Sequence, residues 1–142
     1  MDKSGEVVGQ VAQLVSMVSD YVWDVTLKSN YKFSDGTVVT GQIVADCLNE
    51  LNTVNSAAQS SLGTITATAR DATTVRISST KATHVMDAVL AEWVFTVYLA
   101  DATAVEGFLF TGPYAVQTFM AGDIVLVPNE YYWYVFRADL AA

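Results

Sequence analysis

Cysteine and histidine are scarce in this sequence, and their scarcity removes whole classes of chemistry. The 142 residues include one cysteine, Cys47, and one histidine, His84. One cysteine cannot form an internal disulfide, and these two residues cannot supply the ligands of a structural zinc site. No Gly-x-Ser-x-Gly motif is present that would place a nucleophilic serine beside a histidine base. We therefore expect no metal, no cofactor and no enzymatic activity, and we expect Cys47 to be a buried, inert thiol.

Charged residues are also few, and positive ones are the fewest. Asp and Glu number 15 against 7 Lys and Arg, which gives a net charge of −8. A surface that follows nucleic acid phosphates needs clustered positive charge, so we expect no nucleic acid partner. The spacing of the acidic residues does not single out a catalytic carboxylate pair, and we interpret them as a solvated rim.

The sequence lacks an uninterrupted apolar run that could cross a membrane. Such a helix needs about 18 consecutive apolar residues. The longest candidate, residues 85–110, contains Asp87, Glu92, Asp101 and Glu106. Yet 52% of the residues are hydrophobic and only 15% are charged, which is more apolar surface than a lone small domain covers easily. We expect contacts between subunits to cover it, without membrane insertion.

Apolar residues recur with a heptad rhythm over residues 6–26. A valine occupies one position in three successive heptads, and further valines follow three residues later. These spacings are typical of the a and d positions of a coiled coil, so they predict a helix that associates through this face. The positions are Val8, Val11, Val15, Val18 and Val22. A single core helix of a monomeric domain remains the alternative.

A turn and a second helix follow. Asp35-Gly36 favours a tight chain reversal, and Thr40 has the chemistry of an N-cap. Residues 41–62 repeat the helical rhythm, and Gly63 is a natural stop. The second predicted seam consists of Val44, Leu48, Leu51 and Asn55, in which the polar Asn55 would fix the register. The pattern leaves open whether the two helices pair within one chain or between chains.

One segment resembles a known family. Residues 31–40, which read Tyr-Lys-Phe-Ser-Asp-Gly-Thr-Val-Val-Thr, are followed by Val44, Leu48, Asn49, Leu51, Asn52 and Ala57. This stretch resembles a segment common in fibre and virion proteins of tailed bacteriophages. There a Gly-Thr turn precedes a short helix that often contributes to a trimeric stalk. The resemblance implies a trimeric structural component of a virion.

After Gly63 the period changes from helical to alternating. Residues 64–69 and 74–78 alternate in polarity and read as a hairpin. Further short apolar stretches follow at close spacing as far as residue 137, which predicts an antiparallel β-sandwich or a jelly roll. Residues 122–128 resemble half of a cupin signature, but a metal-binding cupin needs several histidines.

The final predicted strand is apolar on both faces. Its aromatic residues include Tyr131, Trp133 and Tyr134. Such a strand must be covered on both faces, and aromatic residues with one polar atom are enriched where subunits or ligands meet. A core strand, a second subunit contact and a carbohydrate-stacking surface are the three interpretations.

We therefore predict an α+β protein with a helical, heptad-containing association segment over residues 1–62 and a β-sandwich or jelly-roll-like domain over residues 63–142. Its predicted role is a non-enzymatic fibre, spike or head-decoration component of a bacteriophage virion, assembled in the host cytoplasm. The predicted partners are further copies of itself in a trimer, other virion proteins, and a host receptor or glycan. The alternative is a soluble carbohydrate-binding β-sandwich module.

Overall fold

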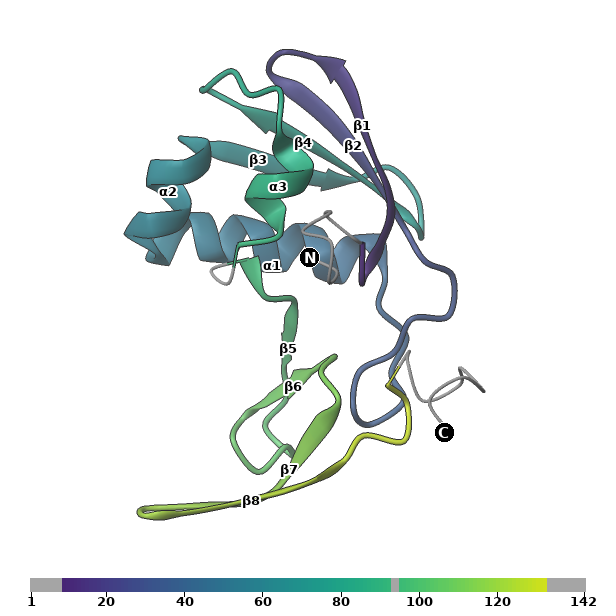
Figure 1. Cartoon of the computed structure of the whole chain (residues 1–142), viewed down its shortest axis with the longest axis vertical. Helices are drawn as coiled ribbons and strands as arrows, with labels where there is room; N and C mark the ends of the chain where they lie inside the picture. Colours follow the sequence, from purple (N-terminus) through teal and green to yellow (C-terminus); the bar gives the residue numbers. More distant parts are fainter. Residues whose placement is uncertain (1–8, 93–94, 133–142) are drawn as a thin grey trace, which may run out of the picture. The chain divides into compact units, whose positions relative to one another are not determined.

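The computed structural model describes residues 9–92 and 95–132, which form helices and antiparallel sheets (Figure 1). The predicted α+β class is therefore confirmed. The elements are β1 (Ala12–Ser19), β2 (Val22–Leu27), α1 (Gly41–Val54), α2 (Ser56–Leu62), β3 (Ile65–Ala69), β4 (Thr74–Ser79), α3 (Met86–Leu90), β5 (Tyr98–Ala100), β6 (Phe108–Phe110), β7 (Tyr114–Met120) and β8 (Asp123–Pro128). Within the described residues, no helix is long and apolar enough to cross a membrane.

The chain divides into two compact units. The first unit comprises the chain up to Ser29 together with Thr40–Thr96, and the second comprises Asn30–Val39 and the chain from Val97 onward. The first unit contains β1 to β4 and the three helices, and the second contains β5 to β8. The predicted boundary between residues 62 and 63 lies inside the first unit. There β2, which precedes the boundary in the sequence, pairs with β4, which follows it.

The first unit is built on a four-stranded antiparallel sheet with the strand order β1-β2-β4-β3. Alternate residues of β2 are buried, beginning with Trp23, as expected for a strand with one face in a core. Val75 and Ile77 of β4 are fully buried. The helix α1 packs against β3 and β4 (Figure 1), and its buried side chains include Val44 and Leu48. This core is the main apolar interior of the unit.

The predicted helix over residues 6–26 is wrong for the part that the structure describes. Residues 12–27 form the antiparallel strands β1 and β2, joined by a turn at Asp20 and Tyr21. The valines of this segment are branched at Cβ, which disfavours helix and favours strand. The prediction of a helix relied on the seven-residue spacing of the valines. Burial in the structure instead follows the two-residue alternation over Trp23–Leu27.

The second predicted helix is confirmed, with one interruption. Thr40 caps α1 as expected, because its side chain accepts a hydrogen bond from the Ile43 N–H at 3.3 Å. Asn55 adopts an extended backbone conformation between α1 and α2, and its side chain accepts from Ala57 N and Ala58 N. Asn55 is thus the N-cap of α2. Gly63 ends α2 with a positive φ of 72°.

Two asparagines of α1 bind the edge of β3. Asn49 forms hydrogen bonds with both backbone groups of Ala67. The Asn52 amide donates to the Gly63 carbonyl at 2.8 Å, and its side-chain oxygen accepts from the Ile65 N–H at 3.1 Å. Because β3 is an outer strand of the sheet, these amides occupy backbone groups that a further strand would need.

The second unit does not contain the predicted sandwich within the described residues. The hairpin of β3 and β4 was predicted correctly, but these strands join β2 in the first unit. The strands that remain form two separate two-stranded sheets, β5-β6 and β7-β8. A sandwich or jelly roll needs two larger sheets packed face to face, and the recruitment of β3 and β4 by β2 leaves too few strands for one.

Candidate binding surface

Residues 30–39 form a compact loop in the second unit, which we call loop 30–39. The Phe33 N–H donates to the Thr37 carbonyl at 2.9 Å, and the Gly36 N–H donates to the Phe33 carbonyl at 3.0 Å. The Asp35 carboxylate accepts from both the backbone N–H and the hydroxyl of Thr37. Gly36 has a φ of +91°, which L-residues rarely adopt. The Asp-Gly turn predicted from the sequence is therefore present.

Tyr131 lies against this loop. The Lys32 ammonium is 5.3 Å from the centroid of the Tyr131 ring, a distance typical of a cation–π contact. A Cβ atom added to Gly36 would lie 3.0 Å from Cζ of Tyr131. Glycine thus lets the ring approach the turn closely. Tyr131 is still 38% exposed.

Asn129 holds the backbone next to Tyr131 in place. It is almost completely buried. Its amide donates to the Gly112 carbonyl at 2.7 Å, and its side-chain oxygen accepts from the Tyr131 N–H at 2.9 Å. The Asn129 N–H donates to the Pro113 carbonyl at 2.9 Å. With all these groups satisfied, Asn129 fixes the turn that carries Tyr131.

Three aromatic residues cluster on β5 and β6. Tyr98 and Phe108 meet edge to face with their ring centroids 5.6 Å apart, and Phe108 and Phe110 are 6.4 Å apart. Phe108 and Phe110 are both partly exposed. The Ser34 N–H donates to the Phe110 carbonyl at 3.0 Å, which joins loop 30–39 to this cluster. We call loop 30–39, Tyr131 and these three aromatic residues the candidate binding surface.

The surface offers aromatic contact and one cation, and nothing on it resembles a metal site. Across residues 9–92 and 95–132, no group of three or more His, Cys, Asp and Glu side chains could hold a metal ion. Cys47 is buried as predicted, and its thiol lies 3.6 Å from the Thr96 carbonyl oxygen in the first unit. His84 is largely exposed and lies 3.9 Å from Asp20.

The residues predicted to form an association seam lie on several different elements. Val15 and Val18 are on β1 and Val22 begins β2, with Val11 just before β1. Val44 and Leu48 are buried in the intramolecular core of the first unit. Leu51 is half-buried on α1 and Asn55 is the cap of α2. Val8, Trp133 and Tyr134 lie outside the described residues, so their role in a subunit contact stays a prediction.

The sequence patterns did not identify Lys32, Phe108 or Asn129. The Asp-Gly signal located the turn, but no local signal connects that turn with Tyr131, which lies far along the chain. The structure exposes a phenylalanine at each end of β6, Phe108 and Phe110, and this exposure is not visible in the sequence.

One comparison with known proteins identifies a family. The family model described as "Bacterial extracellular solute-binding proteins, family 5 Middle" matches residues 6–141. A comparison with the curated proteins finds no match.

Several solved structures share the fold. NikA from Staphylococcus aureus, in complex with Ni(L-His)2, is 23% identical with a TM-score of 0.82 over 94% of this chain and 29% of its own length. The murein tripeptide binding protein MppA of Escherichia coli is 24% identical with a TM-score of 0.69 over 87% of this chain and 30% of its own. Listeria monocytogenes OppA bound to peptide is 21% identical with a TM-score of 0.69 over 93% of this chain and 32% of its own. The chain thus spans about a third of the length of these proteins.

Proposed function

The chain belongs to the bacterial extracellular solute-binding proteins of family 5, and from this premise we propose that it forms the part of a solute-binding protein that contacts a short peptide. The observation that carries the proposal is the match of the family model to residues 6–141. The prediction of a non-enzymatic protein is confirmed by this membership, because solute-binding proteins bind their ligands without transforming them.

The identification as a bacteriophage virion protein was wrong, and the family match overturns it. The predictions of a trimeric fibre, spike or head-decoration role, of virion and host-receptor partners, of a virion location and of a carbohydrate-binding module fall with it. The resemblance misled because it rested on a short stretch of the chain, a turn followed by a helix. In this chain the turn and helix are loop 30–39 and α1.

The choice of a peptide rests on the chemistry of the candidate binding surface. Partly exposed Phe108 and Tyr131 offer apolar and aromatic contact area to side chains. Lys32, beside Tyr131, provides a positive charge for a peptide carboxylate. A bare nickel ion would need several donor side chains, and the described residues hold no cluster of that kind.

The related structures support the proposal by analogy only, because their identities establish the fold and not the ligand. One of these structures is of a murein tripeptide binding protein, and another is of a protein bound to peptide. A third binds nickel already chelated by histidine. We extend the proposal to the usual setting of such proteins: an extracellular or periplasmic location, with the membrane components of an ABC transporter as partners.

The test is a titration of the 142-residue protein with a tripeptide, followed by amide chemical shifts. Because this chain spans only part of the length of its relatives, we expect weak binding, with a Kd on the order of 1 mM, equivalent to about −4 kcal/mol. The shifts should centre on Lys32, Phe108 and Tyr131. Parallel titrations use Ni(L-His)2 and nickel chloride, which should give smaller shifts at these residues.

Matched variants sharpen this test. Tyr131→Ala and Phe108→Ala should each weaken tripeptide binding several-fold, whereas Tyr114→Ala, which removes a more exposed aromatic from β7, should leave it unchanged. Absence of shifts at the candidate binding surface, with or without shifts elsewhere, would contradict the proposal. A stronger response to Ni(L-His)2 would replace the peptide by a chelated metal.

A further inference from the structure

The sequence contains one aspartate that is followed directly by a glycine, Asp35-Gly36, and this aspartate is exposed. In such a pair the glycine nitrogen can attack the side-chain carboxyl group, because glycine has no Cβ atom to hinder the approach. The nitrogen bonds to Cγ, and the hydroxyl of the protonated carboxyl group leaves with the amide proton as water. Water then opens the resulting succinimide ring at either carbonyl, which gives back aspartate or produces isoaspartate. The reaction needs no reagent other than water.

Loop 30–39 holds both reacting groups of this pair in hydrogen bonds. Oδ1 of Asp35 accepts from the Thr37 N–H at 2.8 Å, and Oδ2 accepts from the Thr37 hydroxyl at 2.6 Å. The Gly36 N–H donates to the Phe33 carbonyl at 3.0 Å. Phe33 is completely buried, which anchors that carbonyl. The nitrogen and the carboxyl group are thus bound to different partners, and the attack requires that both contacts break.

Tyr131 restricts the same turn. Gly36 has a φ of +91°, and a Cβ atom added to it would lie 3.0 Å from Cζ of Tyr131. The succinimide would remove the Gly36 N–H, and isoaspartate would add one carbon to the main chain between Asp35 and Gly36. Neither product fits a turn that is closed by the hydrogen bond to Phe33 and packed against the Tyr131 ring.

Two other turns have the same kind of aspartate–threonine contact without a glycine. Asp71 accepts from the backbone N–H and the hydroxyl of Thr73, and Asp101 accepts from the same two groups of Thr103. Alanine follows each of these aspartates, and its Cβ atom hinders the attack. The two turns are therefore internal controls, because they share the threonine contact and differ in the residue after the aspartate.

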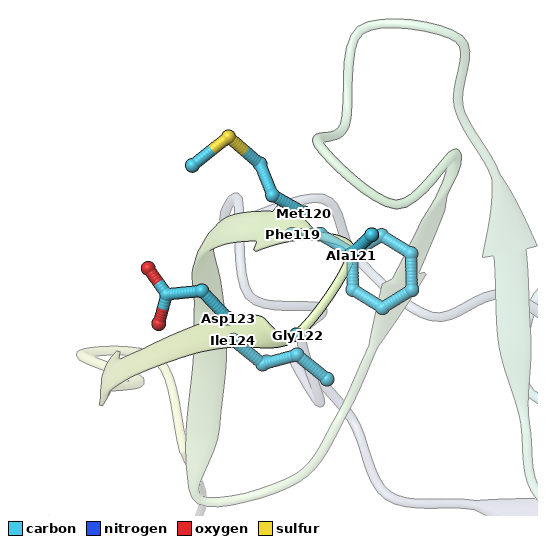
Figure 2. Close-up of a pocket in the computed structure, with 6 residues that line it drawn as sticks. All are labelled: Phe119, Met120, Ala121, Gly122, Asp123 and Ile124. Atoms are coloured by element: carbon cyan, nitrogen blue, oxygen red, sulfur yellow. The ribbon is translucent and has the colours of Figure 1, made fainter.

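The tip of the β7–β8 hairpin also combines aspartate with glycine, but in the opposite order. Gly122 precedes Asp123, and Ile124 follows it (Figure 2). The isoleucine side chain is branched at Cβ and crowds the nitrogen that would attack. We therefore expect no reaction at Asp123.

We propose that Asp35-Gly36 is a latent site of isoaspartate formation, and that Thr37 keeps it unreactive while loop 30–39 is closed. The two hydrogen bonds from Thr37 hold the carboxyl group away from the Gly36 nitrogen, and opening of the loop releases it. Modification would prevent the loop from closing again on Tyr131. The proposal concerns the chemistry of the chain and not the solute, so it can fail independently of the proposed function.

The experiment compares the folded protein with the same protein unfolded in urea. Both are incubated near neutral pH and digested, and the isoaspartyl form of the peptide that contains residue 35 is quantified by liquid chromatography and mass spectrometry against a synthetic standard. We expect formation to be slower in the folded protein by at least about tenfold, because the reaction requires a local opening. Peptides that contain Asp71, Asp101 or Asp123 should form little isoaspartate in either state.

Matched variants test the role of Thr37. Thr37→Val removes the hydroxyl but keeps the N–H, and it should speed isoaspartate formation in the folded protein several-fold because one of the two contacts is lost. Thr37→Ser keeps the hydroxyl and should react as slowly as the parent. In urea all three proteins should react at the same rate. Thr103→Val removes the corresponding hydroxyl beside Asp101 and should produce no isoaspartate there.

Three outcomes would overturn the proposal. The first is isoaspartate at residue 35 forming as fast in the folded protein as in urea, which would mean that the loop does not protect it. The second is the absence of isoaspartate at residue 35 even in urea. The third is an equal rate for Thr37→Val, Thr37→Ser and the parent in the folded state. The comparison of folded and unfolded parent needs no variant, so it decides the first two points even when Thr37→Val does not fold.

Discussion

The side-chain amide of Asn49 pairs with both backbone groups of Ala67: Nδ2 donates to the Ala67 carbonyl at 2.9 Å, and Oδ1 accepts from the Ala67 N–H at 2.8 Å. A helix side chain here replaces the next strand of a sheet. The contact fixes α1 to β3 and closes that edge of the sheet. The Asn49–Ala67 contact therefore connects α1, the helix predicted to follow Thr40, with the core of the first unit.

Replacing Asn49 by leucine should lower the free energy of unfolding. The substitution leaves the N–H and the carbonyl of Ala67 without their partner, and each unsatisfied, partly buried group costs about 1–3 kcal/mol. Urea unfolding measures the change. Glu50→Leu, at an exposed position of the same helix, is the control and should have an effect below about 0.5 kcal/mol. Equal losses for both variants would mean that the amide contact contributes nothing.

The Asp24–Arg76 pair should make stability depend on acid. Arg76 donates from Nε to Oδ1 at 2.8 Å and from Nη2 to Oδ2 at 2.7 Å, and this hydrogen bonding lowers the pKa of Asp24. A lowered pKa in the folded state gives stability that is present above the unfolded value of about 3.9 and is lost as the pH falls through the folded value.

The variant Asp24→Asn should therefore be less stable than the parent near neutral pH by about 1 kcal/mol, a modest figure because the pair is partly exposed. The difference should shrink as the pH falls below about 4. Denaturant unfolding at several pH values measures it. In an Arg76→Gln background the same substitution should produce little pH-dependent difference. A gap that is constant with pH would contradict the assignment of this carboxylate.

Gly36→Ala should destabilise the protein by more than the same substitution at Gly107. Both glycines have positive φ, +91° and +80°, so both variants carry backbone strain of about 1 kcal/mol. Only at Gly36 would the new Cβ also press on the Tyr131 ring; at Gly107 nothing lies within 4 Å. Thermal unfolding compares the two. Combining Gly36→Ala with Tyr131→Ala should bring its cost close to that at Gly107, and an unrelieved cost would exclude the ring contact as the cause.

Cys47 should react with a thiol reagent only when the first unit opens. The side chain is buried on α1, so modification requires an opening of the core. We expect labelling in native buffer to be slower than in urea by at least about a hundredfold. The Asn49→Leu variant, which loosens α1, should speed native labelling. A native rate equal to that in urea would show that the thiol is accessible without opening.

Local patterns predicted what local chemistry determines. The cap at Thr40, the stop at Gly63 and the hairpin over residues 65–79 depend on neighbours in sequence, and the structure has them. The helix predicted around Val15 and Val22 was wrong because the valine spacing was given more weight than branching at Cβ, which favours a strand. The choice was made by pairing with β4, which begins only at Thr74.

The candidate binding surface was the least predictable part. Tyr131 was chosen for its aromatic character, but its contacts with Lys32 and Gly36 join positions far apart in sequence. The role of Asn129 depends on its burial beside Gly112, which composition does not reveal. A reversal such as Asp35-Gly36 indicates where the chain turns and not what the turn will face.

The order in which the chain contributes to its two units has a consequence for synthesis. Residues 30–39 belong with the chain from Val97 onward, whereas Thr40–Thr96 complete the other unit. On the ribosome the four-stranded sheet can close as soon as β4 has emerged, since all its strands are then available. Loop 30–39, which lies between β2 and α1 in the chain, cannot form its contacts with Phe110 and Tyr131 until those residues have been made. The surface that we propose for ligand binding is therefore complete only after Tyr131 has been made, long after its own first residues.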